Sequence, residues 1–203
     1  MEPQETTVQG ADHGLVGLLE RGYGPPAEVI EAISPSEYDA PSPCAGWTVR
    51  DVGNHLVGAL DIFARIVEEH GVDPAEFTDG GAAPDLLGSD PPGAYRAAAD
   101  RCLAAFRRPG ALDEVFPFVP GPAPGFVIAN VGLSEALFHG WDMAHGAGVP
   151  YEPDDAVVAA VARFQAQGSE ADLRAGGMFG PARSVSPDAS PFTALLGFAG
   201  RKA

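Results

Sequence analysis

The sequence predicts an all-α protein folded as an up-and-down helical bundle. Apolar residues recur at intervals of three or four in several segments, strand-like alternation is almost absent, and glycine and proline clusters separate the segments. Apolar residues make up 45% of the 203 residues, which is enough for a hydrophobic core. We therefore expect one bundle domain over residues 1–203, with four or five sizeable helices, extra short helices and a flexible stretch at residues 1–11.

The N-terminal half contains the clearest helix signals. Residues 12–33 have weak helical spacing, and the Gly-Pro-Pro run at residues 24–26 predicts two short helices there, because proline breaks helices. The proline-rich stretch 34–46 is typical of an ordered loop. Thr48 then suits an N-cap, and Asp51 follows three residues later, as in a capping box. An apolar stripe after this cap predicts a long helix.

The remaining elements are predicted from the same signals, the glycine, proline and capping residues that mark the ends of helices. We expect them in this order: the end of the long helix near residue 69, a loop over 71–89, a helix capped by Asp90 that ends before Pro109, a short extended run at 115–119, a long helix over 125–147, a helix over 153–167, and a last short helix at 192–198 packed against the bundle.

Charge and composition exclude several functions. The net charge of −16 should repel phosphate backbones and anionic lipids, so neither nucleic acid nor a membrane surface is expected as a partner. No stretch approaches the roughly 20 apolar residues that span a bilayer, and the N-terminus lacks a signal-peptide pattern. We expect a cytoplasmic protein from a GC-rich bacterium with Cys44 and Cys102 reduced.

Polar residues on a helix that should be apolar indicate a candidate site. Val131, Glu135, His139 and Asp142 follow one another at steps of four, four and three, so they share one helical face. Glu135 and His139 could simply hydrogen-bond each other, or both could bind one metal ion. His55, at the edge of another apolar stripe, is a third candidate. Two imidazoles and one carboxylate suit Zn²⁺, and also Ni²⁺ or Fe²⁺, with coordination positions left open.

Other residues are weaker candidates for the surroundings of this site. Asn54, Asp142, Trp47 and Trp141 are candidates for supporting the ligands or lining a pocket, although core packing would explain the tryptophans equally well. Cys44 could be reactive or incidental, and its role stays open. The absence of P-loop, GxGxxG, GxSxG and HExxH motifs argues against nucleotide-dependent chemistry and a standard hydrolase.

Two motifs resemble signatures of actinobacterial DinB-like metal-binding proteins. They are PSPCAGWTVRDVGNHL at residues 41–56 and SEALFHGWD at residues 134–142, and the segment 178–191 is also similar. This group is similar to the N-terminal domain of mycothiol-dependent maleylpyruvate isomerase. The resemblance implies a four-helix bundle whose metal is held by a histidine of the second helix and an E-x-x-x-H pair of a later one. These positions are His55, Glu135 and His139 here.

The resemblance also implies an activity. In characterised relatives the metal activates a low-molecular-weight thiol such as mycothiol, because metal binding deprotonates a thiol to the nucleophilic thiolate. We therefore expect metal-activated thiol transfer to a small electrophilic metabolite, or its isomerisation, by a homodimer. Unlike in the isomerase, we expect no separate domain after the bundle, and the first helix is expected to be interrupted at residues 24–26. Both departures count against the isomerase reaction itself.

Two alternatives remain open. The first is a thiol-independent enzyme in which the metal acts as a Lewis acid, as a cyclase, dehydratase or hydrolase of a natural-product pathway. The second is a non-catalytic protein that binds a small molecule in the bundle, or a resistance protein that sequesters one there.

Overall fold

The computed structural model describes residues 8–72, 84–169, 174 and 179–202, and for residues 8–13 the backbone alone. The expected flexible segment therefore lies mostly outside the described residues. The chain divides into two compact units, Met1–Tyr151 and Glu152–Ala203, each of which is described by itself. A single domain over the whole chain stays a prediction. No helix in the described ranges is both long and apolar enough to cross a membrane.

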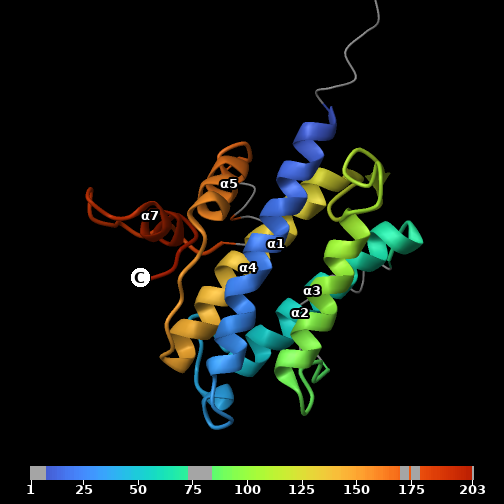
Figure 1. The fold of residues 1–203 in the computed structure, drawn as a ribbon. Coiled ribbons are helices and arrows are strands. Elements are labelled where there is room, and N and C mark those ends of the chain that lie inside the picture. The colour runs from blue at the N-terminus through green and yellow to red at the C-terminus, as the bar shows by residue number, and fades with distance from the viewer. Residues whose placement is uncertain (1–7, 73–83, 170–173, 175–178, 203) are drawn as a thin grey trace, which may run out of the picture. The chain divides into compact units, whose positions relative to one another are not determined.

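Within its described residues, the first unit is built from four long helices (Figure 1). They are α1 (Val8–Ala32), α2 (Val49–Glu69), α3 (Pro91–Phe106) and α4 (Gly125–Ala147). Both α1 and α2 pack against α3 and α4, so α1 and α2 lie on opposite corners of the bundle. The short helix η1 (Glu37–Asp39) and the antiparallel pair β1 (Val115–Phe116) and β2 (Ala123–Pro124) lie in the connections. The predicted all-α bundle is confirmed.

The helix directions bring the start of α2 and the end of α4 together. In Figure 1, α2 and α3 run in one direction, and α1 and α4 run in the other. The parallel course of α2 and α3 is also visible in their contacts. Asn54 near the start of α2 accepts a hydrogen bond from the Leu87 backbone just before α3, and Arg101, farther along α3, pairs with Glu68 near the end of α2. The candidate site residues of α2 and α4 therefore lie at the same end of the bundle.

Capping explains why the observed bounds of α2 and α4 agree with those predicted from the sequence. The Thr48 hydroxyl accepts a hydrogen bond from the Asp51 backbone at 3.2 Å, and the Asp51 carboxylate accepts one from the Thr48 backbone at 2.8 Å. This reciprocal capping box satisfies two donors that a helix start would leave unpaired. At the end of α4, Gly148 adopts a left-handed φ of 69°, as expected for a glycine C-cap.

The expectation of two short helices over residues 12–33 is wrong, because α1 continues through Pro25 and Pro26. A proline inside a helix costs about 3 kcal/mol, and packing of the helix offsets this cost. Pro26 is buried, and it lies so close to Gly140 of α4 that a Cβ at Gly140 would be 2.9 Å from the Pro26 ring. Burial of Val29 and Ile30 after the prolines adds apolar contact that stabilises a continuous helix.

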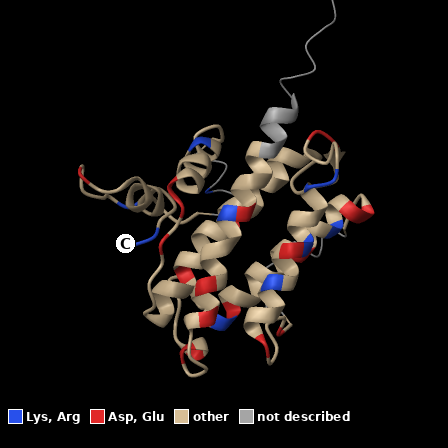
Figure 2. Cartoon of the chain, in the orientation of Figure 1, with Lys and Arg blue, Asp and Glu red and all other residues tan. Residues whose placement is uncertain are grey.

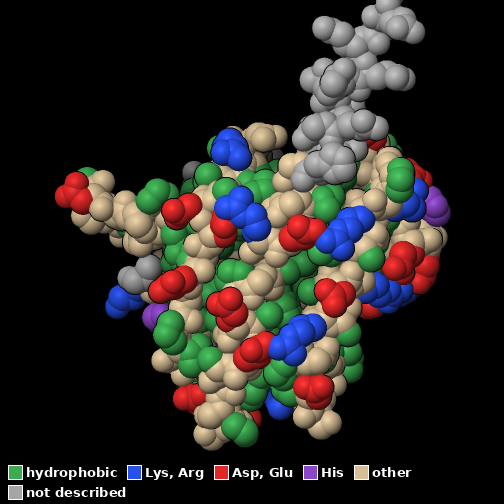
Figure 3. All heavy atoms as spheres, viewed as in Figure 1, with side chains coloured by type: hydrophobic (Ala, Val, Ile, Leu, Met, Phe, Trp, Pro, Cys, Tyr) green, Lys and Arg blue, Asp and Glu red, His purple; other side chains and the backbone are tan. Residues whose placement is uncertain are grey.

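The second unit contains α5 (Asp155–Gln165) and α7 (Pro191–Phe198), which pack against each other. Asp154 caps α5 and Ser190 caps α7, so both helices predicted for this region are confirmed. The predicted packing of the last helix against the bundle stays a prediction. Figure 2 shows the charged residues spread over the helices, and on the face in Figure 3 acidic and basic side chains are interspersed rather than gathered into one patch.

Candidate metal centre

His55, Glu135 and His139 converge between α2 and α4. His55 lies in the second turn of α2, while Glu135 and His139 lie one turn apart on α4. One carboxylate oxygen of Glu135, Oε2, is 3.0 Å from His55 Nε2 and 3.1 Å from His139 Nε2. The three potential ligand atoms all lie within 4.8 Å of one another. The structure thus brings together the three residues that the sequence singled out.

The three side chains differ in their access to solvent. The His139 side chain is only 14% exposed, whereas Glu135 is 27% and His55 is 36% exposed. Trp47 lies against His55 with the ring centroids 5.1 Å apart. The cluster is therefore anchored in the bundle on the His139 side and reachable from solvent on the His55 side. This is a suitable arrangement for a site that must admit a small molecule.

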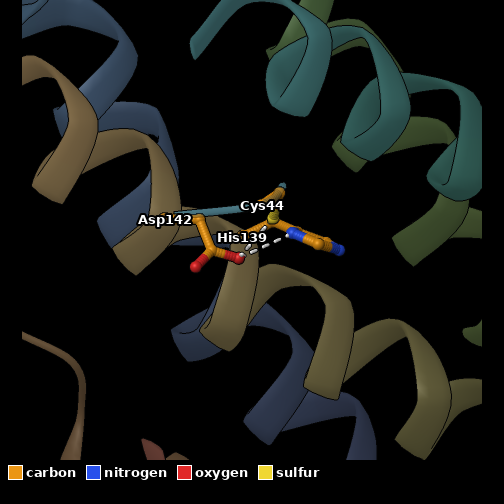
Figure 4. A group of neighbouring side chains, drawn as sticks. All are labelled: Cys44, His139 and Asp142. Carbon is orange, nitrogen blue, oxygen red and sulfur yellow. Dashed lines mark hydrogen bonds and ion pairs between the residues drawn. The ribbon is translucent and has the colours of Figure 1, made fainter. Parts of the chain in front are cut away.

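Behind His139 lies a second group of polar side chains (Figure 4). Asp142, one turn farther along α4, is fully buried. Its Oδ2 atom lies 3.0 Å from His139 Nδ1 and accepts a hydrogen bond from the Cys44 thiol at 3.3 Å. The sequence placed Asp142 on the same face as His139, but it did not predict that Cys44 would join them. The only sequence signal was its position in the Pro/Gly-rich loop before α2.

Hydrogen bonds set the protonation of the cluster. Burial alone would lower the pKa of His139, but hydrogen bonds to Asp142, Cys44 and Glu135 outweigh it and hold that pKa well above its ordinary value. Burial alone would raise the pKa of Glu135, but the hydrogen bonds and charges of His139 and His55 outweigh it and lower that pKa. His139 can donate from Nδ1 to Asp142 and from Nε2 to Glu135, as an imidazolium beside two carboxylates.

The donor set fits a divalent transition metal. Two imidazole nitrogens and one carboxylate oxygen are the ligands of many zinc sites, and they also suit Ni²⁺ and Fe²⁺. A carboxylate hydrogen-bonded to the second nitrogen of a ligating histidine is typical of such sites, and Asp142 stands in that relation to His139. Cys44, His139 and Asp142 form a second group within ligand distance, although its contacts are those of ordinary hydrogen bonds.

Backbone contacts hold Cys44 in place. Within its loop, Pro41 bridges to Thr48, and the Ser42 hydroxyl donates to the Trp47 carbonyl at 2.9 Å and accepts from the Cys44 backbone at 3.2 Å. The loop lies against α4 at Gly146, where a Cβ would be 3.1 Å from the Pro41 carbonyl oxygen. Glycine at this position therefore allows the loop to bring Cys44 up to Asp142.

The other sequence candidates have different partners. Asn54 accepts its hydrogen bond from the Leu87 backbone at 2.9 Å and so ties the segment before α3 to α2. Trp141 stacks on His145 with the centroids 4.6 Å apart, whereas Trp47 contacts the metal-ligand candidate His55. A role for Asn54, Trp47 or Trp141 in lining a substrate pocket stays a prediction.

Two curated proteins are similar to this chain in sequence. The uncharacterized proteins MT0763 and Rv0738 of two Mycobacterium tuberculosis strains are each 27% identical over 122 residues, which is 60% of this chain and 61% of theirs. The chain thus spans about three fifths of the length of these curated relatives.

Two crystal structures share the fold. A DinB-like protein, YjoA of Bacillus subtilis, has a TM-score of 0.54 at 13% identity, with 70% of this chain and 99% of that chain covered. The mycothiol-dependent maleylpyruvate isomerase has a TM-score of 0.52 at 14% identity, with 73% and 67% covered. Residues 26–144 match the family described as the mycothiol maleylpyruvate isomerase N-terminal domain. Because this match covers more than half of the sequence, the chain belongs to that family.

Proposed function

We propose that this protein is a metal-dependent enzyme that transfers a thiol to, or isomerises, a small electrophilic metabolite. The observation that carries the proposal is the convergence of His55 and His139 on one oxygen of Glu135. Zinc is the metal that this donor set favours most, with nickel or iron as alternatives. Mycothiol is the proposed co-substrate, because the family and one structural neighbour bear its name.

Each part of the site would have a distinct role in this reaction. A bound divalent metal would supply the acidity that converts a coordinating thiol into a nucleophilic thiolate at neutral pH. His139, held from behind by Asp142, would fix one side of the site. Glu135 would contribute negative charge in a largely buried position. His55 and the neighbouring Trp47 lie on the more exposed side, where a thiol and its acceptor could enter.

Metal analysis of protein purified without a metal-chelating tag tests the proposal. We expect about one metal ion per chain in the wild type. In His55→Ala, Glu135→Gln and His139→Ala we expect the affinity to fall by more than about 100-fold, since even changes of second-layer residues cost 10–100-fold. His70→Ala is the matched control, because His70 pairs with Glu114 elsewhere in the bundle. A metal-free wild type, or unchanged binding in the three variants, would refute the proposal.

Thiol use requires a second measurement on the metal-loaded protein. We expect mycothiol to change the absorption spectrum of the cobalt-substituted wild type, because sulfur coordination produces an intense charge-transfer band. If metal binds and the spectrum does not respond to mycothiol, thiol transfer is excluded.

A further inference from the structure

The buried Asp142 carboxylate is the centre of this inference. Its side chain is 0% exposed, and a buried carboxylate is costly unless hydrogen bonds satisfy it. One oxygen, Oδ2, meets two groups from opposite parts of the sequence, His139 Nδ1 at 3.0 Å and Cys44 Sγ at 3.3 Å (Figure 4). Asp142 therefore links the loop before α2 to the ring of a candidate metal ligand.

The hydrogen bond to Nδ1 determines what the opposite nitrogen of the ring can do. A histidine that donates from Nδ1 to a carboxylate has its ring orientation fixed, and its Nε2 is left for a ligand. In this protein Nε2 of His139 faces Glu135 Oε2, 3.1 Å away, while the His55 ring lies edge-on with its centroid 4.8 Å from that of His139. The Nδ1 atom of His139 is thus paired with Asp142, and its Nε2 atom is paired with Glu135.

Cys44 acts on the same carboxylate from the other side. Its thiol donates to the oxygen that faces His139, and its sulfur lies within 4.8 Å of the nearby ring nitrogen of His139. The loop that carries Cys44 is fixed by the Ser42 hydroxyl and by its close approach to Gly146 of α4. A cysteine at this position is therefore presented to Asp142 by rigid surroundings.

We propose that Asp142 and Cys44 are positioning residues that hold the His139 ring with Nε2 directed at Glu135 and thereby set the affinity of the metal site. The proposal rests on the metal-dependent function proposed above. It assigns Cys44 a role as a hydrogen-bond donor in its thiol form, and not as a metal ligand or a nucleophile.

Metal affinity in four variants tests the proposal. Asp142→Asn keeps the shape of the side chain and removes its charge, and we expect Zn²⁺ affinity to fall about 10–100-fold in competition with a chromophoric chelator. Cys44→Ala removes a neutral donor and should cost about two- to tenfold. Cys44→Ser retains a donor and should restore most of the loss. Equal affinity of Cys44→Ala and wild type, or of Asp142→Asn and wild type, would overturn the proposal.

Matched controls separate positioning from general damage. Cys102→Ala removes the other cysteine of the chain, which is buried beside Tyr23, and Asp61→Asn removes an α2 carboxylate that pairs with Arg101. Both should bind Zn²⁺ as the wild type does. If Cys102→Ala weakened binding as much as Cys44→Ala, the effect would come from lost stability and the proposal would be wrong.

Nuclear magnetic resonance of the metal-free protein provides a readout that does not depend on the metal. We expect the His139 Nδ1 proton to be observable, downfield and protected from exchange in the wild type. It should move upfield or exchange away in Asp142→Asn, and shift in Cys44→Ala but less in Cys44→Ser. An absent or unresponsive proton would overturn the proposal. If the wild type bound no metal while this proton behaved as expected, the proposed function would fail and the positioning of His139 would stand.

Discussion

The chemistry of the site depends on His139, because its two ring nitrogens serve two different groups. Nε2 lies 3.1 Å from Glu135, and Nδ1 lies 3.0 Å from the Asp142 oxygen to which the Cys44 thiol also donates. A change at Asp142 can therefore act through the His139 ring on the Glu135 side of the site. This coupling through one side chain distinguishes the arrangement from an isolated pair of hydrogen-bonded residues.

The two cysteines should differ in their reaction with thiol reagents. Cys102 is fully buried, and burial raises the pKa of its thiol to about 12, so almost no thiolate is present at pH 8. Cys44 is only partly buried. We expect one thiol per folded chain to react with an aromatic disulfide reagent, and two in denaturant. Folded Cys44→Ala should show none and folded Cys102→Ala should show one. Rapid reaction of both thiols in the folded wild type would contradict this prediction.

Residue spacing could predict part of the site and no more. Glu135, His139 and Asp142 belong to one helix, so steps of four and three residues place them on one face. Spacing alone left His55 a plausible third member, and resemblance to a family was needed to select it. Cys44 lies 98 residues before Asp142, and no local pattern indicates a contact over that distance. Tertiary packing of the loop against α4 creates it.

Among the elements, α4 depends on glycine where other segments approach it closely. A Cβ at Gly146 would lie 2.7 Å from a Val49 methyl and 3.1 Å from the Pro41 carbonyl oxygen, while a Cβ at Gly17 of α1 would meet nothing within 4 Å. In a helix, alanine is favoured over glycine by roughly 0.5–1 kcal/mol. Overpacking costs about 1–3 kcal/mol, which outweighs that gain at Gly146.

We therefore expect the same substitution to have opposite effects at the two sites. Gly146→Ala should lower the free energy of unfolding by about 1–2 kcal/mol, the overpacking cost less the helix gain. Gly17→Ala should raise it by roughly 0.5–1 kcal/mol. Urea denaturation followed by circular dichroism measures both. Stabilisation by Gly146→Ala would mean that the Cys44 loop does not lie against α4 as described.

The elements were predictable where local signals determine them. The capping box of Thr48 and the glycine after α4 define helix ends by bonds among neighbouring residues, so the sequence predicted these bounds well. The continuity of α1 through Pro25 and Pro26 was not predictable. The continuity of α1 depends on its contacts with α4. The contacting residues of α4, such as Gly140, are more than 100 positions away in the sequence.

For the molecule as a whole, the bundle has buried all four of its tyrosines to a degree that affects their ionisation. Burial raises the pKa of Tyr23, Tyr95 and Tyr151, and to a smaller extent that of Tyr38, where the charge of Arg50 acts in the opposite direction. Tyr95 also donates a hydrogen bond to the Tyr23 backbone, and Tyr151 donates one to the Leu137 backbone. These bonds join α3 to α1 and tie the segment after α4 back to α4, and each needs a neutral phenol as its donor.

This burial predicts how the protein responds to alkaline pH. A group whose pKa is raised in the folded state contributes stability that is fully present below its unfolded pKa, about 10 for tyrosine, and that is lost as pH rises through the folded value. We expect the free energy of unfolding to fall as the pH is raised above about 10. In a pH titration, the tyrosinate absorbance of the folded protein should rise at a higher pH than that of the protein unfolded in guanidinium. This rise should coincide with the loss of the helical circular dichroism signal. If tyrosinate absorbance were half-maximal near pH 10 while the protein stayed fully helical, the phenols would be accessible to solvent. That result would contradict the burial of the tyrosines described above.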